Sequence, residues 1–94
     1  MIGFDWDDAN LGHIALHAVS PEEAEEVLTG MAFEVDTYTV DGEVRVEEIG
    51  ATQAGRILKV VTTVRDGLIR VVTAFDAVKA EKLAFLEHQR RLYD

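Results

Sequence analysis

The chain of 94 residues has no cysteine, which excludes a disulfide framework, a thiolate zinc site and a cysteine nucleophile. It has a single proline and no hydrophobic run near the roughly 18 apolar residues that a membrane span needs. Its first residues, MIGFDWDD, lack the basic and apolar regions of a secretory signal. We therefore expect a cytoplasmic protein that has no membrane partner.

Positive charge is also scarce, above all in the first half of the chain. Residues 1–50 carry thirteen acids and a single base, whereas residues 51–94 carry five acids and eight bases. The net charge of −9 argues against general affinity for nucleic acid, since lysine and arginine drive phosphate binding. The second half could still offer an anion-binding surface. The alternative interpretation is that the acids are solvated helix and loop faces.

What is present fits one globular domain over residues 1–94, because 48% of the residues are hydrophobic and there is no linker or repeat. The segment Ile2–Trp6 alternates loosely and predicts a short edge strand. Asp7 or Asp8 can then cap a first helix. Apolar residues at helical spacing predict its buried stripe: Leu11, Ile14, Ala15 and Ala18. The opposite face is predicted to be polar, with Asn10, His13 and His17.

A second helix begins at Ser20-Pro21-Glu22-Glu23, a capping-box pattern with proline at the first helical position. We expect this helix to end at Gly30 in a left-handed conformation. A hairpin follows around the turn Asp41-Gly42. With the later segments, these patterns predict an α+β fold: two N-terminal helices, an antiparallel sheet of about four strands, and a C-terminal helix packed on the sheet.

The strongest strand signal is a second hairpin, in which Arg56–Arg65 and Leu68–Ala74 flank the turn Asp66-Gly67. A regular two-residue turn would place Lys59 opposite Ala74. One face of this hairpin is then apolar and is the predicted core: Leu58, Val60, Val64, Ile69, Val71 and Phe75. The other face is cationic, with Lys59, Arg65 and Arg70 beside Thr63.

Asp76 is placed to cap a last helix. The heptad line that we expect to pack on the sheet consists of Val78, Phe85 and Leu92, flanked by Ala77 and Ala84. Leu83, Leu86 and Tyr93 are surplus to one-sided packing. This surplus predicts a further contact, either a homo-oligomer formed through this helix or a waiting protein partner.

The two helical histidines form a first candidate site. His13 and His17 are four residues apart, a spacing that can bind a metal. A third ligand would have to come from elsewhere, for instance Asp8 or Glu81. Because no convergent set of three ligands can be read, we expect no bound metal and no cofactor. A nonmetal role for at least one histidine and a solvated helix face remain as alternatives.

The cationic sheet face is a second candidate, because Arg65 and Arg70 offer paired donors to a phosphate and Lys59 adds a point charge. The alternative is an ordinary exposed face whose charges balance the acidic half of the chain. Glu81 and His88 fall beside the apolar stripe of the last helix, where edge hydrogen bonding is favoured over catalysis. The chain has no Gly-rich phosphate loop, Walker lysine or nucleophile elbow, so nucleotide hydrolysis and acyl transfer have no support.

Short motifs lie in a consistent order over nearly the whole chain. In the first half they are Trp6-Asp7, Asn10, His13-Ile14, His17-Ala18-Val19 and the segment from Ser20 to Val27. In the second half they are Gly55-Arg56-Ile57-Leu58 and Arg70-Val71-Val72-Thr73-Ala74. This order resembles the BrnT family of small bacterial type II toxins. The resemblance implies a RelE-like ribonuclease fold and neutralisation by a BrnA-like antitoxin that also represses the shared operon.

The resemblance further implies cleavage of RNA without a metal. In toxins of this kind basic side chains hold the phosphate, assist attack of the 2′-hydroxyl and stabilise the developing negative charge. For this chain the predicted catalytic residues are His17, as acid or base, with Arg56 and Arg70 on the phosphate. The predicted substrate-binding residues are Asn10, His13, Lys59 and Arg65.

Two positions depart from the family pattern. The residue before the second histidine is usually Arg or Lys but is Leu16 here, and an arginine usually follows the last strand where Phe75 stands. Both changes remove a cation, which implies a weakened or lost activity. Two hypotheses follow: a BrnT-like ribonuclease toxin, or a nonenzymatic relative that acts through protein contacts. The predicted register also places Arg56 on the other face of the sheet from Lys59 and Arg70, so the three converge only if Arg56 lies at a strand end or beyond a bulge.

Overall fold

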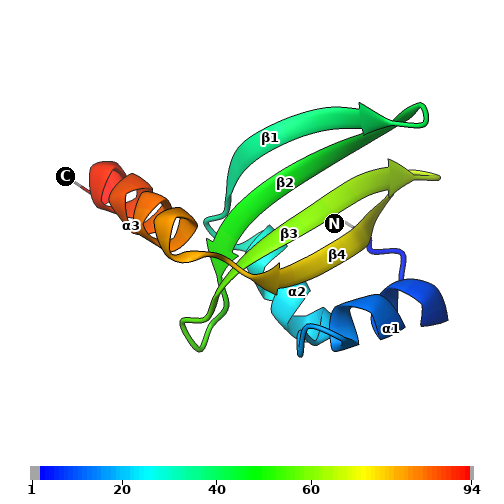
Figure 1. The fold of residues 1–94 in the computed structure, drawn as a ribbon, viewed down its shortest axis with the longest axis horizontal. Coiled ribbons are helices and arrows are strands. Elements are labelled where there is room, and N and C mark those ends of the chain that lie inside the picture. The colour runs from blue at the N-terminus through cyan, green and yellow to red at the C-terminus, as the bar shows by residue number, and fades with distance from the viewer. Residues whose placement is uncertain (1–2, 94) are drawn as a thin grey trace.

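The structure, a computed structural model, describes residues 3–93. This part of the chain forms three helices and one antiparallel sheet of four strands, which confirms the predicted α+β fold (Figure 1). In chain order the elements are α1 (Asp8–Ala15), α2 (Pro21–Thr29), β1 (Phe33–Val40), β2 (Glu43–Ala51), β3 (Ile57–Arg65), β4 (Leu68–Asp76) and α3 (Lys79–Tyr93). The strands lie in the order β1-β2-β3-β4, so each strand pairs with its neighbours in sequence.

Both tight turns have the predicted positions. Asp41-Gly42 joins β1 to β2, Asp66-Gly67 joins β3 to β4, and all four residues have positive φ. Such a turn matches the twist of a hairpin, and Asp-Gly tolerates it because glycine has no Cβ and aspartate can bond to its own backbone. Since the sheet is a simple meander, the two turns lie at the same end of it.

The N-terminal helices begin where their capping residues predict. The Asp7 carboxylate accepts a bond from the N–H of Asn10, and the Asn10 side chain accepts one from the N–H of Asp7. Ser20 and Glu23 form the same reciprocal box at the start of α2. These boxes satisfy N–H groups that the first turn of a helix leaves unpaired. The expected left-handed residue at Gly30 is wrong, because its φ is −98°.

The predicted edge strand Ile2–Trp6 is reduced to a single bridge within the described residues. Phe4 pairs in parallel with Ile69 of β4, with one backbone hydrogen bond on each side of it. Ile2 itself lies outside the described residues. The bridge ties the start of the chain to the edge formed by β4.

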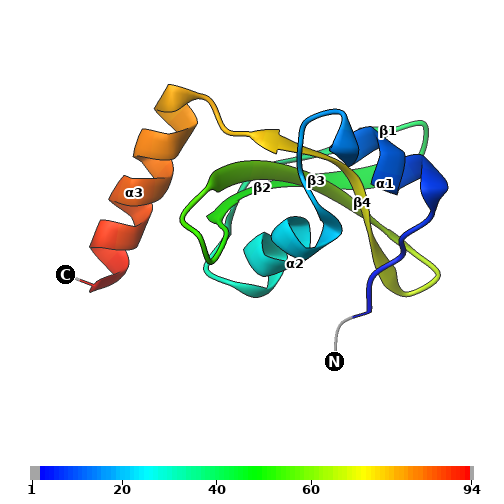
Figure 2. The ribbon, with the colours of Figure 1, turned by 90° about the horizontal axis from the view of Figure 1, so that it is seen from below.

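The main core lies where α1 and α2 meet one face of the sheet (Figure 2). Its buried side chains are Ile14, Val19, Ala24, Val27, Leu58, Val60, Val71 and Ala74. Gly50 of β2 allows the close approach of α2, because a Cβ at this position would lie 2.9 Å from Cγ1 of Val27. Of the stripe predicted on α1, Ile14 is fully buried but Ala15 and Ala18 are exposed. The helix therefore presents a different face to the sheet than its apolar spacing predicts.

The second hairpin leaves its predicted register at a bulge in β4. Thr63 lies opposite Arg70, as expected, but the pairing then shifts by one residue, so that Lys59 lies opposite Phe75 rather than Ala74. A bulge of this kind turns the following side chains to the other face. The prediction of Phe75 as a core residue is therefore wrong, because it shares the open face with Lys59 and is only half-buried.

The apolar face of the sheet extends beyond the helices that cover it. Val64 is 71% exposed, and Val44 of the neighbouring strand β2, which lines the same surface, is 54% exposed. The prediction of Val64 as a core residue is therefore wrong. Leu58 and Val60, on the same face of β3, lie under the helices and are fully buried.

Helix α3 docks on the end of the sheet through one turn. Phe85 is buried with Ile49 and Ala77, and the half-buried Phe33 packs against this cluster and stacks on the ring of His88. The predicted stripe is wrong at its two ends, because Val78 and Leu92 are 60% and 54% exposed, and Ala84 is exposed too. The helix begins as β4 leaves the sheet, so only its middle reaches the apolar surface (Figure 1).

The predicted cap of α3 is also wrong. Asp76 is the last residue of β4, and its carboxylate accepts a hydrogen bond from Arg56. The Glu81 carboxylate instead accepts a bond from the N–H of Val78 at the start of the helix. In the described part of the chain, no helix is both long enough and apolar enough to span a membrane.

Glu48 lowers the stability of the fold at neutral pH, for a reason that the sequence does not show. It lies directly opposite Glu34 of β1, and both its burial and the charge of Glu34 raise its pKa. A carboxyl with a raised pKa destabilises the fold while it is ionised, and the fold gains stability as pH falls through that pKa. We expect Glu48→Gln to raise the free energy of unfolding at pH 7 by roughly 0.5–1 kcal/mol.

Urea unfolding at pH 7 and pH 4 tests this prediction, and the gain should vanish at the lower pH because Glu48 is then protonated. Glu47→Gln is the matched control, since Glu47 is the next residue on the strand and forms an ion pair with Lys59. Loss of that pair should leave the fold unchanged or slightly less stable. A Glu48→Gln protein that is less stable than the wild type at pH 7 would contradict the account.

Candidate functional site

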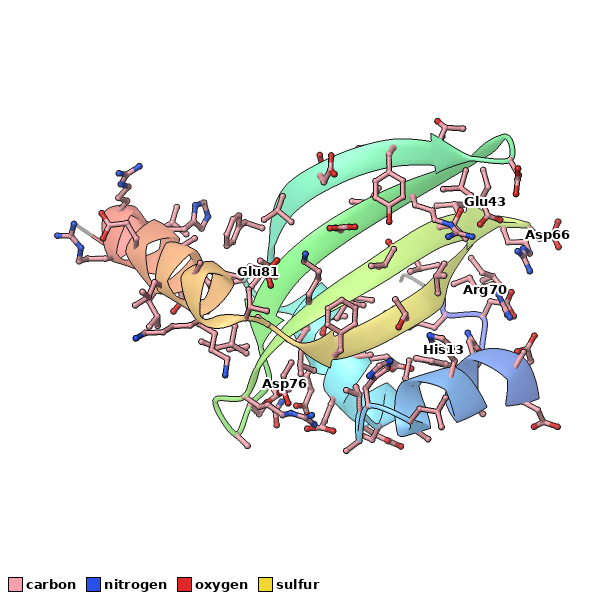
Figure 3. The ribbon with its side chains drawn as sticks, viewed as in Figure 1. His13, Glu43, Asp66, Arg70, Asp76 and Glu81 are labelled. Atoms are coloured by element: carbon pink, nitrogen blue, oxygen red, sulfur yellow. The ribbon has the colours of Figure 1, made fainter. Side chains whose placement is uncertain are left out.

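A pocket of about 450 Å³ lies between α1 and the turn end of the sheet. We call it the α1–β4 pocket, and its polar lining consists of Asn10, His13, Glu43, Arg45, Arg65, Arg70 and Thr73. Figure 3 shows His13, Glu43 and Arg70 at this end of the sheet. The pocket brings together four of the predicted site residues: Asn10, His13, Arg65 and Arg70.

Arg70 is bound by two acids of the N-terminal segment. Its guanidinium donates to both carboxylate oxygens of Asp7, at 2.9 and 3.1 Å, and lies 3.4 Å from a carboxylate oxygen of Asp5. The bond to Asp7 raises the pKa of Arg70, and the bonds from Arg70 and from the Asn10 N–H lower the pKa of Asp7. The Arg70 side chain is only 11% exposed. Its main contacts hold the N-terminal segment against β4, and little of it is accessible to a phosphate.

The other two arginines of the pocket share one carboxylate. Glu43 accepts a bond of 3.0 Å from Arg65 and one of 3.4 Å from Arg45. These bonds lower the pKa of Glu43, with Arg65 as the larger cause. Arg45 and Glu43 were not among the site residues predicted from the sequence. The two Asp-Gly turns are the signal that could have found them, since turns at one end of a meander bring the flanking residues of β2 and β3 together.

Asn10 does not lie on the exposed polar face that the helical spacing predicts. Asn10 is only 3% exposed, and its side-chain NH2 group donates hydrogen bonds to the carbonyl oxygens of Asp5 and Val71. The amide oxygen takes part in the cap of α1 at Asp7. A buried carbonyl without a donor is costly, so these bonds tie the helix to β4. The structure therefore uses both ends of the Asn10 amide within the fold.

The two histidines of the N-terminal helical segment lie side by side. The ring centroids of His13 and His17 are 5.8 Å apart in an edge-to-face arrangement, and both residues are exposed. His13 lines the pocket, while His17 lies in the turn after α1 with its ring 5.7 Å from that of Phe75. Imidazole can accept and donate protons near neutral pH, so this pair can supply both an acid and a base.

Arg56 lies just before β3, at a strand end, which was one of the two alternatives given for it from the sequence. Its guanidinium donates to the carbonyl oxygens of Ala18 at 2.6 Å and His17 at 3.3 Å. It also binds the carboxylates of Glu23 and Asp76. The bond to Asp76 is the main cause of its raised pKa. Since Ala18 has a φ of 55°, which residues with a Cβ rarely adopt, Arg56 stabilises a strained turn.

Arg56 and Arg70 do not converge. Arg70 holds Asp7 at the beginning of α1, whereas Arg56 holds the carbonyl oxygens beyond its end. Eight helical residues span about 12 Å, so a single phosphate cannot bridge the two guanidinium groups. Lys59 also lies outside the pocket lining, where it forms ion pairs with Glu47 and Glu81. Within residues 3–93, no three His, Cys, Asp or Glu side chains converge on a point that could hold a metal ion.

A comparison with protein families decides what kind of protein this is. A sequence model of the family described as "Ribonuclease toxin, BrnT, of type II toxin-antitoxin system" matches residues 6–81. The chain belongs to the BrnT family. The match covers every element from α1 to β4, and it confirms the resemblance drawn from the short motifs. Neither the curated proteins nor the solved structures gave a significant match.

Membership of the BrnT family identifies a toxin of a toxin-antitoxin pair and implies an antitoxin partner. The two residues that the resemblance implies as departures, Leu16 and Phe75, both lie beside His17. Leu16 is 80% exposed and precedes His17, and Phe75 contacts the ring of His17. Apolar side chains thus flank His17.

Proposed function

We propose that this BrnT-family toxin cleaves RNA without a metal at the α1–β4 pocket, and that it does so slowly. The observation that carries the proposal is that His13, Arg65 and Arg70 line one pocket, while the ring of His17 lies beside that of His13. This set contains the groups that metal-independent cleavage needs: a proton acceptor, a proton donor and cations that bind phosphate.

In the proposed reaction, a ribose 2′-oxygen attacks the adjacent phosphorus, and the bond from phosphorus to the 5′-oxygen of the next nucleotide breaks. His13 accepts the proton of the 2′-hydroxyl and His17 donates one to the leaving 5′-oxygen. The products are a 2′,3′-cyclic phosphate and a free 5′-hydroxyl. Arg65 binds the phosphate, because it is the more exposed of the two predicted phosphate ligands in the pocket, with 51% of its side chain accessible.

The proposed activity is low because acids compete with the phosphate. Arg65 and Arg45 are bound to Glu43, and Arg70 is bound to Asp7 and Asp5. RNA must displace these carboxylates or bind beside them, and a net charge of −9 adds long-range repulsion. Arg56 acts as a positioning residue for the turn that carries His17, rather than as a phosphate ligand.

The proposal places the toxin in the cytoplasm, where its RNA substrate and its antitoxin are made. Binding of the antitoxin then silences the toxin. A second candidate function is a nonenzymatic one, in which the chain acts through protein contacts alone. It is favoured by the ion pairing of each pocket arginine and by the exposed leucines of α3, Leu83 and Leu86.

Growth of bacteria that express the chain alone tests the proposal. We expect induction of the wild-type protein to slow growth, and the double variant His13→Ala/His17→Ala to restore it, because the variant lacks both proton-transfer groups. Both side chains are exposed, so the variant should fold. His88→Ala is the matched control, since His88 lies on α3 against Phe33, and it should leave the toxic effect intact. A wild-type chain that is harmless at high expression would contradict the enzymatic function.

A further inference from the structure

The exposed side of α3 combines leucines with lysines. Leu83 and Leu86 are 57% and 51% exposed, and the neighbouring Lys79 and Lys82 are exposed as well. We call these four residues the α3 outer face. An α-helix turns by about 100° per residue, so residues 79, 82, 83 and 86 lie within one sector of α3. This sector points away from the side on which Phe85 is buried.

The α3 outer face stands clear of the rest of the molecule. Helix α3 projects from one end of the sheet, and its buried contacts come from Phe85, which packs with Ile49 and Ala77 (Figures 1 and 2). The α1–β4 pocket lies at the opposite end of the sheet, beside the two Asp-Gly turns. A partner could therefore bind α3 without entering the pocket.

The charges of the α3 outer face are unlike those of the remaining chain. Residues 1–78 carry five cations and fifteen acids, whereas residues 79–93 carry four cations and two acids. Each of the five cations before α3 contacts a carboxylate: Arg45, Arg56, Lys59, Arg65 and Arg70. By contrast, Lys79 and Lys82 form no ion pair with any described residue. Lys82 does act on the more distant Asp76, whose pKa its charge helps to lower. Helix α3 thus offers positive charge that has no directly bonded carboxylate beside exposed leucines.

We propose that the α3 outer face is a docking surface for an acidic amphipathic segment of the antitoxin. This inference rests on the proposed toxin function. Leucines of such a segment cover Leu83 and Leu86, and its carboxylates pair with Lys79 and Lys82. Opposite charge makes this occupant complementary, and helices that lay apolar anchors into an exposed face are a common mode of recognition.

The charges also decide against two other occupants. A second copy of the chain would bring the same lysines together across a twofold axis, and like charges at an interface oppose association. An anionic membrane is an extended surface and would face the acidic remainder of a chain whose net charge is −9, whereas a single segment on α3 meets mainly the local lysines. The homo-oligomer predicted from the sequence is therefore the less favoured occupant of this face.

Binding of the purified toxin to the purified antitoxin of the same module tests the inference. We expect Leu83→Glu/Leu86→Glu to weaken binding by on the order of 100-fold, because the anchors are lost and charge is added. Lys79→Glu/Lys82→Glu should weaken binding at 0.1 M salt and lose part of the deficit at 0.5 M salt, because salt screens the repulsion. Val64→Glu is the matched control, since it places a glutamate at an exposed valine far from α3, and it should bind as the wild type does.

Three results would overturn the inference. The first is an antitoxin that binds the leucine variant as tightly as the wild type. The second is a wild-type dimer in sedimentation that Leu86→Glu abolishes, which would place a second copy on α3. The third is binding of the wild type to vesicles of anionic lipid, lost in the lysine variant. Failure of the proposed ribonuclease function is distinguishable, because it would appear as intact RNA while antitoxin binding still depended on Leu83 and Leu86.

Discussion

Ile14→Ala is expected to lower the free energy of unfolding by about 2–5 kcal/mol. Ile14 is fully buried in the main core, where α1 meets the sheet, and alanine would leave a cavity there. A domain of this size has about 5–15 kcal/mol of stability in total, so the loss should lower the melting temperature by about 10 °C or more. The same variant should lose activity, since α1 carries His13 and leads into His17.

Leu16→Ala is the matched control for this prediction. Leu16 follows the same helix and loses the same kind of side chain, but it is 80% exposed. Leu16 is the C-cap of α1, but it caps the helix through its backbone N–H, which alanine keeps. Truncation of its exposed side chain should therefore change stability by about 0.5 kcal/mol or less. Urea unfolding of the three proteins gives the comparison. Equal stability losses in the two variants would show that α1 does not pack as described.

Glu43→Gln is expected to raise the rate of RNA cleavage by about tenfold, which corresponds to about 1.4 kcal/mol of transition-state stabilisation. Glu43 binds both Arg65 and Arg45, so removal of its charge frees two guanidinium groups for the phosphate. Glutamine keeps the shape of the side chain and its place in the strand. This prediction separates a weakened enzyme from an inactive one, because only a site that still works can gain from the change.

Glu47→Gln is the control for charge, since Glu47 lies on the same strand and pairs with Lys59 outside the pocket. It makes the same change in net charge, so any general effect of reduced repulsion of RNA would appear in both variants. The comparison requires initial rates on one RNA at several salt concentrations. Equal rates for the Glu43 and Glu47 variants would contradict competition between the carboxylate and the phosphate.

Local signals predicted the elements of the fold well. Each of these signals acts over a few consecutive residues, so all of the interacting residues can be recognised together in the sequence. They are the capping boxes at Asp7 and Ser20 and the two Asp-Gly turns. The strand order follows, because short turns join neighbours. The family motifs lie in these same elements, which explains why they supported the correct family.

Features that depend on distant packing were not predictable. The bulge in β4 moved Phe75 to the open face, and no residue within the hairpin signals that shift. Asn10 reads as polar and exposed on a helical wheel, yet it is buried because its amide binds Val71 on a strand sixty-one residues away. The side of α3 that is buried depends on the point at which β4 leaves the sheet, and the spacing of the leucines in α3 gives no information about that point.

The candidate site was predicted in part. The residue types were found, and His13, Arg65 and Arg70 do line one pocket. Their acid partners were missed, because ion pairs between Arg70 and Asp7 or between Arg65 and Glu43 join residues that are far apart in sequence. Arg56 was assigned to the phosphate, whereas its contacts hold the turn at Ala18. The proposal of slow cleavage depends on these pairs.

Incubation of the purified chain with RNA in the presence of a metal chelator shows whether the protein is a metal-independent ribonuclease. We expect slow cleavage that leaves 2′,3′-cyclic phosphate ends, that persists in His88→Ala, and that is lost in His13→Ala/His17→Ala. RNA that stays intact with the folded wild-type protein, or cleavage that the double histidine variant retains, would contradict the proposed function.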